Sequence, residues 1–498
     1  MSAMPLSLAL TIRSCRPATQ RLLPALLVAA GLSACSTPAV YERPAQPVPA
    51  HYKQALAATA GGVWQPAQAG QIAAEAPAAW WTLYGDATLD ALQEQAASGN
   101  QSIALSLARL RAAQAAVASS RASMAPTLGT TASASRARSG SQAADGSSNT
   151  RTSTSYSLGL NASWELDLWG RIAGTVDAAQ AAAQASADDL AAARLSVQAS
   201  VAQTYFSLRA AEANAQILRE TLQAYERSLE LTRNRQQAGV ASVADVAQAE
   251  SQYKSTQVQL LEAETTRTQL ENALAALLGQ APASFSLPAT GALPQPPVVP
   301  AQLPSQLLER RPDIAAAERR VAAANAQIGV AQAAFFPALT LSGTAGYRGS
   351  ELSNLFNAPN LFWSLGPQLA LSLLDGGART AAMESARAAN EQATATYRQT
   401  VLTALQEVED NLTAATALAQ EQQLQTEALA AAQRALDVVN NQYRAGTVGY
   451  LNVITAQATV LSAQRSLIDV RSRRLAAVNT LLKNVAGSWS IAAEEAAR

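Results

Sequence analysis

Apolar residues recur every three and four positions along several long stretches of the chain. Series that repeat at nearly every seventh residue run over 201–229, 246–274 and 453–481. Such spacing is typical of helices that pack against other helices, as in a coiled coil. It predicts long helices with helix–helix contacts along most of their length. An ordinary antiparallel bundle would give the same period, so this pattern alone leaves both arrangements open.

Two glycine-containing segments interrupt these helical patterns. Gly446 and Gly449 lie within 442–455, and Gly239 takes the place of Gly446 in a similar segment 207 residues earlier. Glycine adopts positive φ at little steric cost, so the chain can reverse direction at both places. The two reversals, with matching helical patterns around them, predict two internal repeats, each containing a long helical hairpin.

The hydrophobic period changes to two after Pro126 and again after Pro337, which predicts strands. In the first repeat the alternating segments flank a polar loop predicted at 138–151, and in the second they flank a loop predicted near 349–359. The expected β-hairpins span 127–166 and 338–374. One face of each strand is apolar, while the other carries mainly serine, threonine, glycine, asparagine and glutamine.

These strands are long enough, at about ten residues each, to cross a bilayer at a tilt. Four strands are too few to close a barrel, and an open edge in lipid leaves backbone groups without hydrogen-bond partners. If the strands span a membrane, several copies of the chain must therefore share one barrel. A soluble four-stranded sheet with one buried face is the alternative that the pattern leaves open.

The N-terminus has the features of a targeting segment. Three arginines precede an apolar stretch at 22–30 that is too short to span a bilayer. The tetrapeptide Leu-Ser-Ala-Cys at 32–35 resembles the lipobox of bacterial lipoproteins. By that resemblance, 1–34 is a lipoprotein signal peptide, and Cys35 is the lipidated first residue, sorted to the outer membrane. A plain secretory leader with an incidental cysteine is the alternative.

Composition argues against several functions. Only 14% of the 498 residues are charged and the formal net charge is zero, so no nucleic-acid partner is expected. The single histidine, His51, lies in a proline-rich arm, and there are two cysteines. We therefore expect no catalytic residues, no metal site and no cofactor, and no phosphate-binding loop motif is visible.

Four groups of residues carry a resemblance to a known family. They are Cys35 with Tyr41–Pro44, Trp80–Asp86 with Leu89 and Leu92, Leu303–Ile314 with Ala317 and Glu318, and Tyr443–Thr447. On these residues the chain resembles the outer-membrane efflux lipoproteins of the TolC superfamily, NodT type, which serve as exit ducts of resistance-nodulation-division pumps. The resemblance covers nearly the whole chain from Cys35 to about Gly487, and 310–314 is its most specific part.

The resemblance implies an α+β membrane protein that acts as a homotrimer. Each chain would give four strands to a β-barrel in the outer membrane, continuous with a long α-helical barrel in the periplasm. The expected parts are an acylated arm and the start of an equatorial region at 35–85, a first repeat at 86–281, a proline-rich linker at 282–304, a second repeat at 305–487 and a tail at 488–498. The prolines of the arm predict that it lacks regular helix.

The function implied by the resemblance is transport rather than catalysis. The trimer would be the channel of a tripartite efflux system, opened at its periplasmic tip by an adaptor protein and supplied by an inner-membrane pump. It would be anchored to outer-membrane lipid through the acylated N-terminus. An exit duct for type I protein secretion and a structural trimeric lipoprotein are the alternatives.

The resemblance also assigns a gate to the hairpin tips. Tyr443 and Asp245 occupy the places of a tyrosine and an aspartate that form a hydrogen bond to a neighbouring hairpin and help hold the mouth shut. An acid that favours the helix dipole is the alternative role for Asp245. Asn452 and Thr455 stand where relatives carry acidic rings, which predicts an uncharged constriction.

Leu451 is the expected narrowest ring of this gate, because three copies of a leucine exclude water as well as restrict size. A core position for Leu451 is the alternative. Docking of the adaptor is expected at the small residues and exposed backbone of the two tips. These docking residues are Gly239, Val240, Gly446, Thr447 and Val448, and Val448 stands where a relative has an arginine.

Overall fold

The structure is a computed structural model that describes residues 41–60, 62, 64–65, 79–142, 148–300 and 311–485. Contacts divide the chain into two compact units. The sheet unit includes 117–179 and 323–390, and the helical unit includes 43–116, 180–322 and 391–485. Within the described residues, no helix is both long and apolar enough to serve as a transmembrane span.

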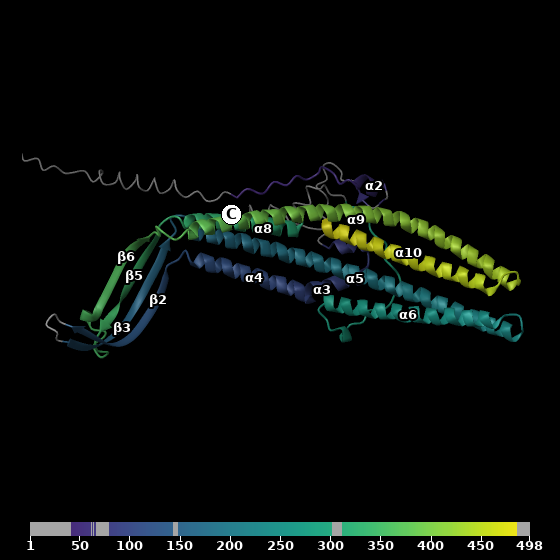
Figure 1. Ribbon diagram of the computed structural model, residues 1–498, viewed down its shortest axis with the longest axis horizontal. Helices are drawn as coiled ribbons and strands as arrows, with labels where there is room; N and C mark the ends of the chain where they lie inside the picture. Colours follow the sequence, from purple (N-terminus) through teal and green to yellow (C-terminus); the bar gives the residue numbers. More distant parts are fainter. Residues whose placement is uncertain are drawn as a thin grey trace, which may run out of the picture. The chain divides into compact units, whose positions relative to one another are not determined.

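The sheet unit contains four antiparallel strands in the order β2-β3-β5-β6 (Figure 1). The strands are β2 (Thr127–Gln142), β3 (Ser148–Leu166), β5 (Ala338–Gly349) and β6 (Leu361–Ala370). Both hairpins expected from the period-two pattern are therefore present, although the second ends at Ala370 and not at 374 as predicted. They pair with each other through β3 and β5, with Leu160 opposite Ala345.

The loop predicted at 138–151 is wrong in its bounds. The strands extend into this segment from both sides, since β2 reaches Gln142 and β3 begins at Ser148, with Arg138 opposite Thr152 and Ser139 opposite Arg151. The segment was assigned to a loop because it lacks an apolar face. Backbone ladder bonds need no apolar side chains, so strands continue where both faces are polar.

Strand register gathers the apolar side chains on one face of the sheet. Leu160, Ala345 and Trp363 share this face across three strands. The opposite face is polar, and Ser133 and Ser157 form a hydrogen bond there at 2.7 Å. Trp363 is 74% exposed and Leu365 is 69% exposed, so the apolar face is bare in the single chain. The edge strands β2 and β6 each pair on one side only within this sheet.

Two sets of helices with matching lengths make up most of the remaining chain. The helical segment before the first strand is broken after Gly99, where α3 ends, and α4 begins at Gln101. The equal lengths of α4 and α8, at 22 residues, and of α5 and α9, at 67 residues, confirm the internal repeat. The helices are α3 (Ala87–Gly99), α4 (Gln101–Ala122), α5 (Arg171–Gln237), α6 (Val243–Leu277), α8 (Pro312–Ala333), α9 (Ala378–Arg444) and α10 (Tyr450–Val485).

The seven-residue pattern marks buried helix–helix contacts in the helical unit. In α5, Val201 and Leu208 are fully buried, and in α10, Val453 and Leu481 are buried in the same way. Hydrogen bonds link α5 to α6 through Arg219 and Glu264, α5 to α10 through Ser228 and Tyr450, and α9 to α10 through Gln425 and Ala463. The predicted contacts along long helices are therefore confirmed.

The tryptophan-rich motif before α3 forms a 3₁₀ turn, η2 (Trp80–Tyr84), with Trp80 buried. Gly85 follows with φ of +63°, and Asp86 caps α3 by accepting backbone N–H groups of Thr88 and Leu89. The Tyr205 hydroxyl of α5 donates to the same Asp86 carboxylate. The motif thus fixes the start of α3 against α5.

The prediction that the N-terminal arm lacks regular helix is wrong. A short helix, α2 (Ala55–Ala60), forms where no helix was expected, because this segment contains none of the prolines that surround it. Just before α2, the backbone N–H groups of Lys53 and Gln54 donate to the Glu409 carboxylate of α9. The arm is therefore attached to the second repeat.

A buried ion pair holds the described part of the linker. Arg209 and Glu212, with side chains each 2% exposed, lie 2.7 Å apart in α5. Arg209 donates to the carbonyl of Pro288, and Glu212 accepts the N–H of Thr290. After these contacts the linker forms β4 (Val299–Pro300), which pairs in parallel with β1 (Trp64–Gln65).

Candidate functional site at the hairpin tips

The first tip lies between α5 and α6 and turns at Gly239. This glycine has φ of +73°, a left-handed conformation that side-chain-bearing residues rarely adopt. The N–H groups of Gly239 and Val240 donate to the Gln236 and Arg235 carbonyls at 3.0 and 2.8 Å. These bonds satisfy carbonyl groups that the end of α5 would otherwise leave free.

The second tip repeats this turn between α9 and α10. Gly446 has φ of +79°, and its N–H donates to the Tyr443 carbonyl at 3.0 Å. Thr447 donates both its backbone N–H and its hydroxyl to the Gln442 carbonyl, each at 3.0 Å. The two glycines singled out in the sequence are therefore the reversal points of two equivalent hairpins.

Asp245 has a structural partner within its own tip. Its backbone N–H donates to the Ser242 hydroxyl oxygen at 3.1 Å, and its carboxylate accepts the Ser242 N–H at 2.9 Å. This reciprocal pair is a capping box, and the acid also lies in the first turn of α6, where the helix dipole favours negative charge. The alternative considered for Asp245 therefore describes its position in the single chain.

Tyr443 lies in an apolar cluster formed by the two tips. Its ring centre is 5.6 Å from that of Tyr450, and the Arg235 guanidinium stands 4.6 Å from the Tyr443 ring centre. In the described part of one chain, no hydrogen bond joins Tyr443 to Asp245. The bond expected between neighbouring hairpins stays a prediction. The buried members of the cluster are Leu229, Ala249, Tyr443, Tyr450, Val453 and Ile454.

Tyr450 is a residue that sequence reasoning missed. Its hydroxyl lies 2.9 Å from the Ser228 hydroxyl and links the second tip to α5. Burial raises the pKa of the Tyr450 hydroxyl, against the effect of its bonds to Ser228 and Thr232, so the hydroxyl stays neutral near pH 7. No local pattern around Ser228 or Tyr450 signals this contact, because the two residues are 222 positions apart.

The residues expected to form the constriction share one exposed side of α10. Leu451 is 65% exposed, and Asn452 and Thr455 are also exposed. Leu451 therefore takes no part in the core of a single chain. No side chain in this group is charged, so a pore lined by it would be uncharged.

The predicted docking residues differ in accessibility. Gly239, Val240, Gly446 and Thr447 are exposed at the tips, whereas Val448 is half-buried against the tip cluster. The predicted lipidation site, Cys35, lies outside the described residues. Across the described ranges, no group of three or more histidine, cysteine, aspartate or glutamate side chains could hold a metal ion.

A chain that combines an open four-stranded sheet, bare on its apolar face, with two long helical hairpins has the architecture of an outer-membrane channel subunit. Comparison with known proteins supports this assignment. The chain belongs to the outer membrane efflux protein family, whose sequence pattern matches residues 92–280 and 303–487. The two matched segments correspond to the two repeats.

Individual relatives are similar over nearly their whole length. The chain is 32% identical over 473 residues to the probable efflux pump outer membrane protein TtgC of Pseudomonas putida, covering 95% of this chain and 96% of TtgC. It is 34% identical over 471 residues to the outer membrane protein OprJ of Pseudomonas aeruginosa, covering 93% and 95%. A solved structure of the outer-membrane channel OprN matches with a TM-score of 0.81 and 29% identity, covering 91% of this chain and 99% of that one.

Proposed function

We propose that this protein is the outer-membrane channel of a tripartite efflux system and that three copies form one duct. Each copy supplies four strands to a β-barrel in the outer membrane and two helical hairpins to an α-barrel in the periplasm. Substrates enter at the hairpin tips and leave at the cell surface. The relatives named as efflux proteins support export by a pump.

The observation that carries this proposal is the sheet. Its apolar face is bare, and its edge strands β2 and β6 each have one side without a strand partner in the chain. In lipid, such edges are tolerated only where another strand pairs with them. Additional copies of the same sheet provide those partners and turn every apolar face toward lipid.

The proposed partners follow from the two ends of the duct. Cys35, as the acylated N-terminus, anchors each copy in the outer membrane. A periplasmic adaptor binds the exposed turns at Gly239, Val240, Gly446 and Thr447, and an inner-membrane pump delivers substrate. No chemical reaction is assigned to the chain.

The proposed gate consists of Leu451, Asn452 and Thr455 from three copies, held closed by packing at the tips and by a bond from Tyr443 to Asp245 of a neighbouring hairpin. A hydrogen bond to a carboxylate contributes about 1.5 to 3 kcal/mol. With three copies, this contribution is large enough to set the fraction of open channels. The Asp245 carboxylate already bonds Ser242, and its further acceptor sites are available to a tyrosine hydroxyl.

Conductance across a planar lipid bilayer tests the proposal. The purified protein should insert and give discrete conductance steps. Tyr443→Phe, which removes only the hydroxyl, should raise the open fraction if the gate bond exists, and Leu451→Ala should raise conductance further. Arg219→Ala, an exposed position in α5, serves as a control. If neither the original protein nor the variants conduct, a channel function is ruled out.

A further inference from the structure

The β2–β3 hairpin extends beyond the rest of the sheet. Pairing of β3 with β5 ends at Tyr156 opposite Gly349, whereas pairing of β2 with β3 continues to Gln142 opposite Ser148. The segments 135–142 and 148–155 form this extension, the outer ribbon, which spans about 26 Å at about 3.3 Å per residue. The helices α4 and α5 join the opposite ends of the two strands, so the ribbon lies at the end of the sheet away from them.

Two arginines continue the apolar face of the sheet onto the outer ribbon. On this face of β3, Leu160 is followed by Leu158 and then by Tyr156. The next side chains on the same face are those of Arg136 and Arg138 on β2, because they lie opposite Thr154 and Thr152. Both arginines, here called the outer arginines, are exposed. The apolar face therefore changes to a positively charged one just past Tyr156.

This change of character matches the edge of the hydrocarbon core of a bilayer. The apolar face runs from Leu166 to Tyr156, ten positions along β3, which is about 33 Å of strand. A tilt of about 40° reduces this length to about 25 Å, the height of the apolar band on outer-membrane barrels. Tyrosine suits the boundary, because its ring is apolar and its hydroxyl is polar. The outer arginines then lie at the level of the lipid head groups.

The charge of the outer arginines is not balanced nearby. Between Thr127 and Trp164 the only acidic residue is Asp145, which lies outside the described residues. Within the described residues neither outer arginine forms an ion pair, and Arg138 donates only to the neutral hydroxyl of Thr150, at 3.4 Å. The two guanidinium groups are therefore available to an anion from outside the chain.

The opposite end of the same sheet unit is different, because its arginines are neutralised by carboxylates. Arg171 lies 2.7 Å from Glu165, and Arg379 lies 2.6 Å from Asp375. Both ends carry two arginines, but among the described residues only the inner end supplies acids for them. Exposed guanidinium groups without such partners are thus a feature of the outer end.

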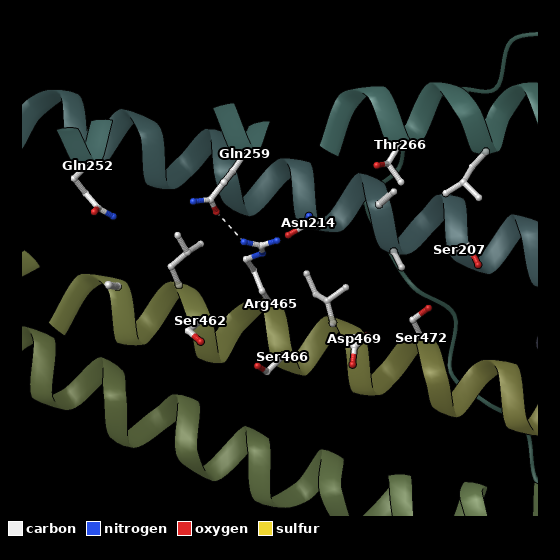
Figure 2. Close-up of a pocket in the computed structure, with 16 residues that line it drawn as sticks. Ser207, Asn214, Gln252, Gln259, Thr266, Ser462, Arg465, Ser466, Asp469 and Ser472 are labelled. Atoms are coloured by element: carbon white, nitrogen blue, oxygen red, sulfur yellow. Dashed lines mark hydrogen bonds between the residues drawn. The ribbon is translucent and has the colours of Figure 1, made fainter. Parts of the chain in front are cut away.

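The polar groove between α10 and the first helical hairpin gives a second contrast. Figure 2 shows Arg465 of α10 in this groove, with Asn214 of α5 beside it. Arg465 donates to the Gln259 side chain of α6 at 2.8 Å. Asp469, which lines the same groove, pairs with Arg473 at 2.8 Å. Arg465 thus has a partner inside the chain, unlike Arg136.

We propose that the outer arginines bind phosphate groups of the glycolipid in the outer leaflet of the outer membrane, while Leu158 and Leu160 contact its acyl chains. This proposal rests on the proposed function, which places the apolar face in lipid and the outer ribbon at the cell surface. A guanidinium binds phosphate through two parallel hydrogen bonds. The hydroxyls of Thr152 and Thr154 provide further donors on the same face.

An anionic lipid fits this surface better than another ligand does. The positive charge adjoins an apolar face directly, so the matching ligand has an anionic group joined to apolar chains. A free anion would contact the arginines alone and would leave Leu158 and Leu160 unused. Three copies of the chain present three such pairs of arginines around the barrel, each facing lipid.

Titration with lipid A, which carries phosphate groups, tests this site. Native mass spectrometry of the complex in mild detergent counts the lipid A molecules bound. Arg136→Gln together with Arg138→Gln should raise the lipid A concentration at half occupancy about tenfold, because it removes charge-assisted hydrogen bonds. The single substitutions should each give a smaller shift in the same direction.

The matched control is Arg151→Gln together with Arg348→Gln. It removes the same charge from exposed arginines of the same sheet, but both of these lie on the polar face, opposite Ser139 and Ser157. This control should bind lipid A as the original protein does. Equal losses in the two double variants would show a general effect of charge and would overturn the proposal.

Two further arms identify the ligand. Lipid A without its phosphate groups should bind the original protein and the Arg136→Gln, Arg138→Gln variant equally. Inorganic phosphate at the concentration of the lipid should not displace lipid A, since it lacks the acyl chains. Displacement by inorganic phosphate would assign the arginines to a free anion and would contradict a lipid site.

Failure of this proposal can be told apart from failure of the proposed function. If the original complex contains three copies and conducts, but the Arg136→Gln, Arg138→Gln variant binds lipid A equally tightly, only the lipid site is overturned. If that variant loses the complex in the absence of lipid A, and Glu351→Gln in the connection after β5 does the same, the arginines pair between copies instead. If the original protein neither assembles nor conducts, both proposals are overturned.

Discussion

Ion pairs in the helical unit differ in how much they contribute to the stability of the fold, depending on whether the charged side chains are buried. Arg209 and Glu212 are almost completely buried and bind the linker, whereas the ion pair of Arg219 and Glu264 lies on the surface of the same hairpin, with side chains 46% and 43% exposed. Removal of one partner from a buried pair leaves a charge without compensation in a poorly hydrated site, whereas a surface charge is returned to water. One substitution in the buried pair can therefore be compared with one in the exposed pair of the same hairpin.

Glu212→Ala should lower the free energy of unfolding by about 3 to 5 kcal/mol. The substitution leaves the buried Arg209 guanidinium without its carboxylate partner, and the Thr290 N–H of the linker loses its acceptor. Arg219→Ala should change stability by less than about 1 kcal/mol. Urea unfolding followed by helical circular dichroism measures both. Equal effects of the two substitutions would contradict the role assigned to the buried pair.

Asp188 should make stability depend on pH. Its partial burial in α5 raises the pKa of the carboxyl to about 6, although Arg319 opposes this shift. Because the folded chain then holds a proton that the unfolded chain has released, stability should fall as pH rises from about 4 to 6. Asp188→Asn should therefore be more stable than the original protein above pH 6, and the difference should narrow as the pH falls toward 4.

Thermal unfolding at several pH values between 4 and 8 would measure this difference. Asp177→Asn, an exposed substitution in the same helix, serves as the control. A constant difference between Asp188→Asn and the original protein across that pH range would show that the carboxyl does not titrate in this way.

Among the structural elements, the turns at the hairpin tips need glycine because it adopts a positive φ. The second tip contains two glycines on which this requirement can be tested. Gly446 has φ of +79°, whereas Gly449, three residues later, is not among the described glycines with positive φ, and a Cβ there would meet no atom within 4 Å. Gly446→Ala should therefore cost about 1 to 2 kcal/mol locally, and Gly449→Ala should be nearly neutral. Hydrogen exchange of the amides in 442–452 measures the change. Similar exchange in the two variants would argue against a conformational requirement at Gly446.

Elements were predictable where one physical signal dominates. The seven-residue period located the long helices, and Gly239 and Gly446 located the tips, because both signals are local in sequence. The outer ends of β2 and β3 were missed because their side chains are polar on both faces, so only pairing between strands defines them. The helix α2 was missed because neighbouring prolines outweighed six residues that contain none.

At the hairpin tips, too, contacts between residues far apart in the sequence could not be predicted. Leu451, Asn452 and Thr455 were expected at the gate because of the family resemblance, and the structure exposes them together. The contact between Tyr450 and Ser228 joins residues 222 positions apart, so no local pattern announces it. A position at a helix start was the alternative considered for Asp245, because the helix dipole favours an acid there, but the capping box with Ser242 was not anticipated.

At the scale of the whole molecule, the sheet must face two environments. Trp363 lies on the bare apolar face of β6, and its neighbour Ser364 lies on the polar face, where it bonds Thr344 at 2.7 Å. Trp363→Lys should reduce assembly in the outer membrane, since a lysine on a lipid-facing strand costs about 2 to 4 kcal/mol near the middle of the bilayer. Ser364→Lys should be tolerated in a watery lumen.

The amount of assembled protein in purified outer membranes, measured after mild detergent extraction, distinguishes these two variants. If Ser364→Lys were the more damaging substitution, the assignment of the two faces would be reversed. If both were harmless, the sheet would not lie in a bilayer.

The central claim is that one chain forms only part of a closed duct. Native mass spectrometry of the complex released from membranes in mild detergent tests it most directly, because it counts chains without assuming an activity. We expect three copies of the mature chain, each carrying the added mass of acyl chains at Cys35. A single chain that keeps its helical and strand content in detergent would contradict the claim.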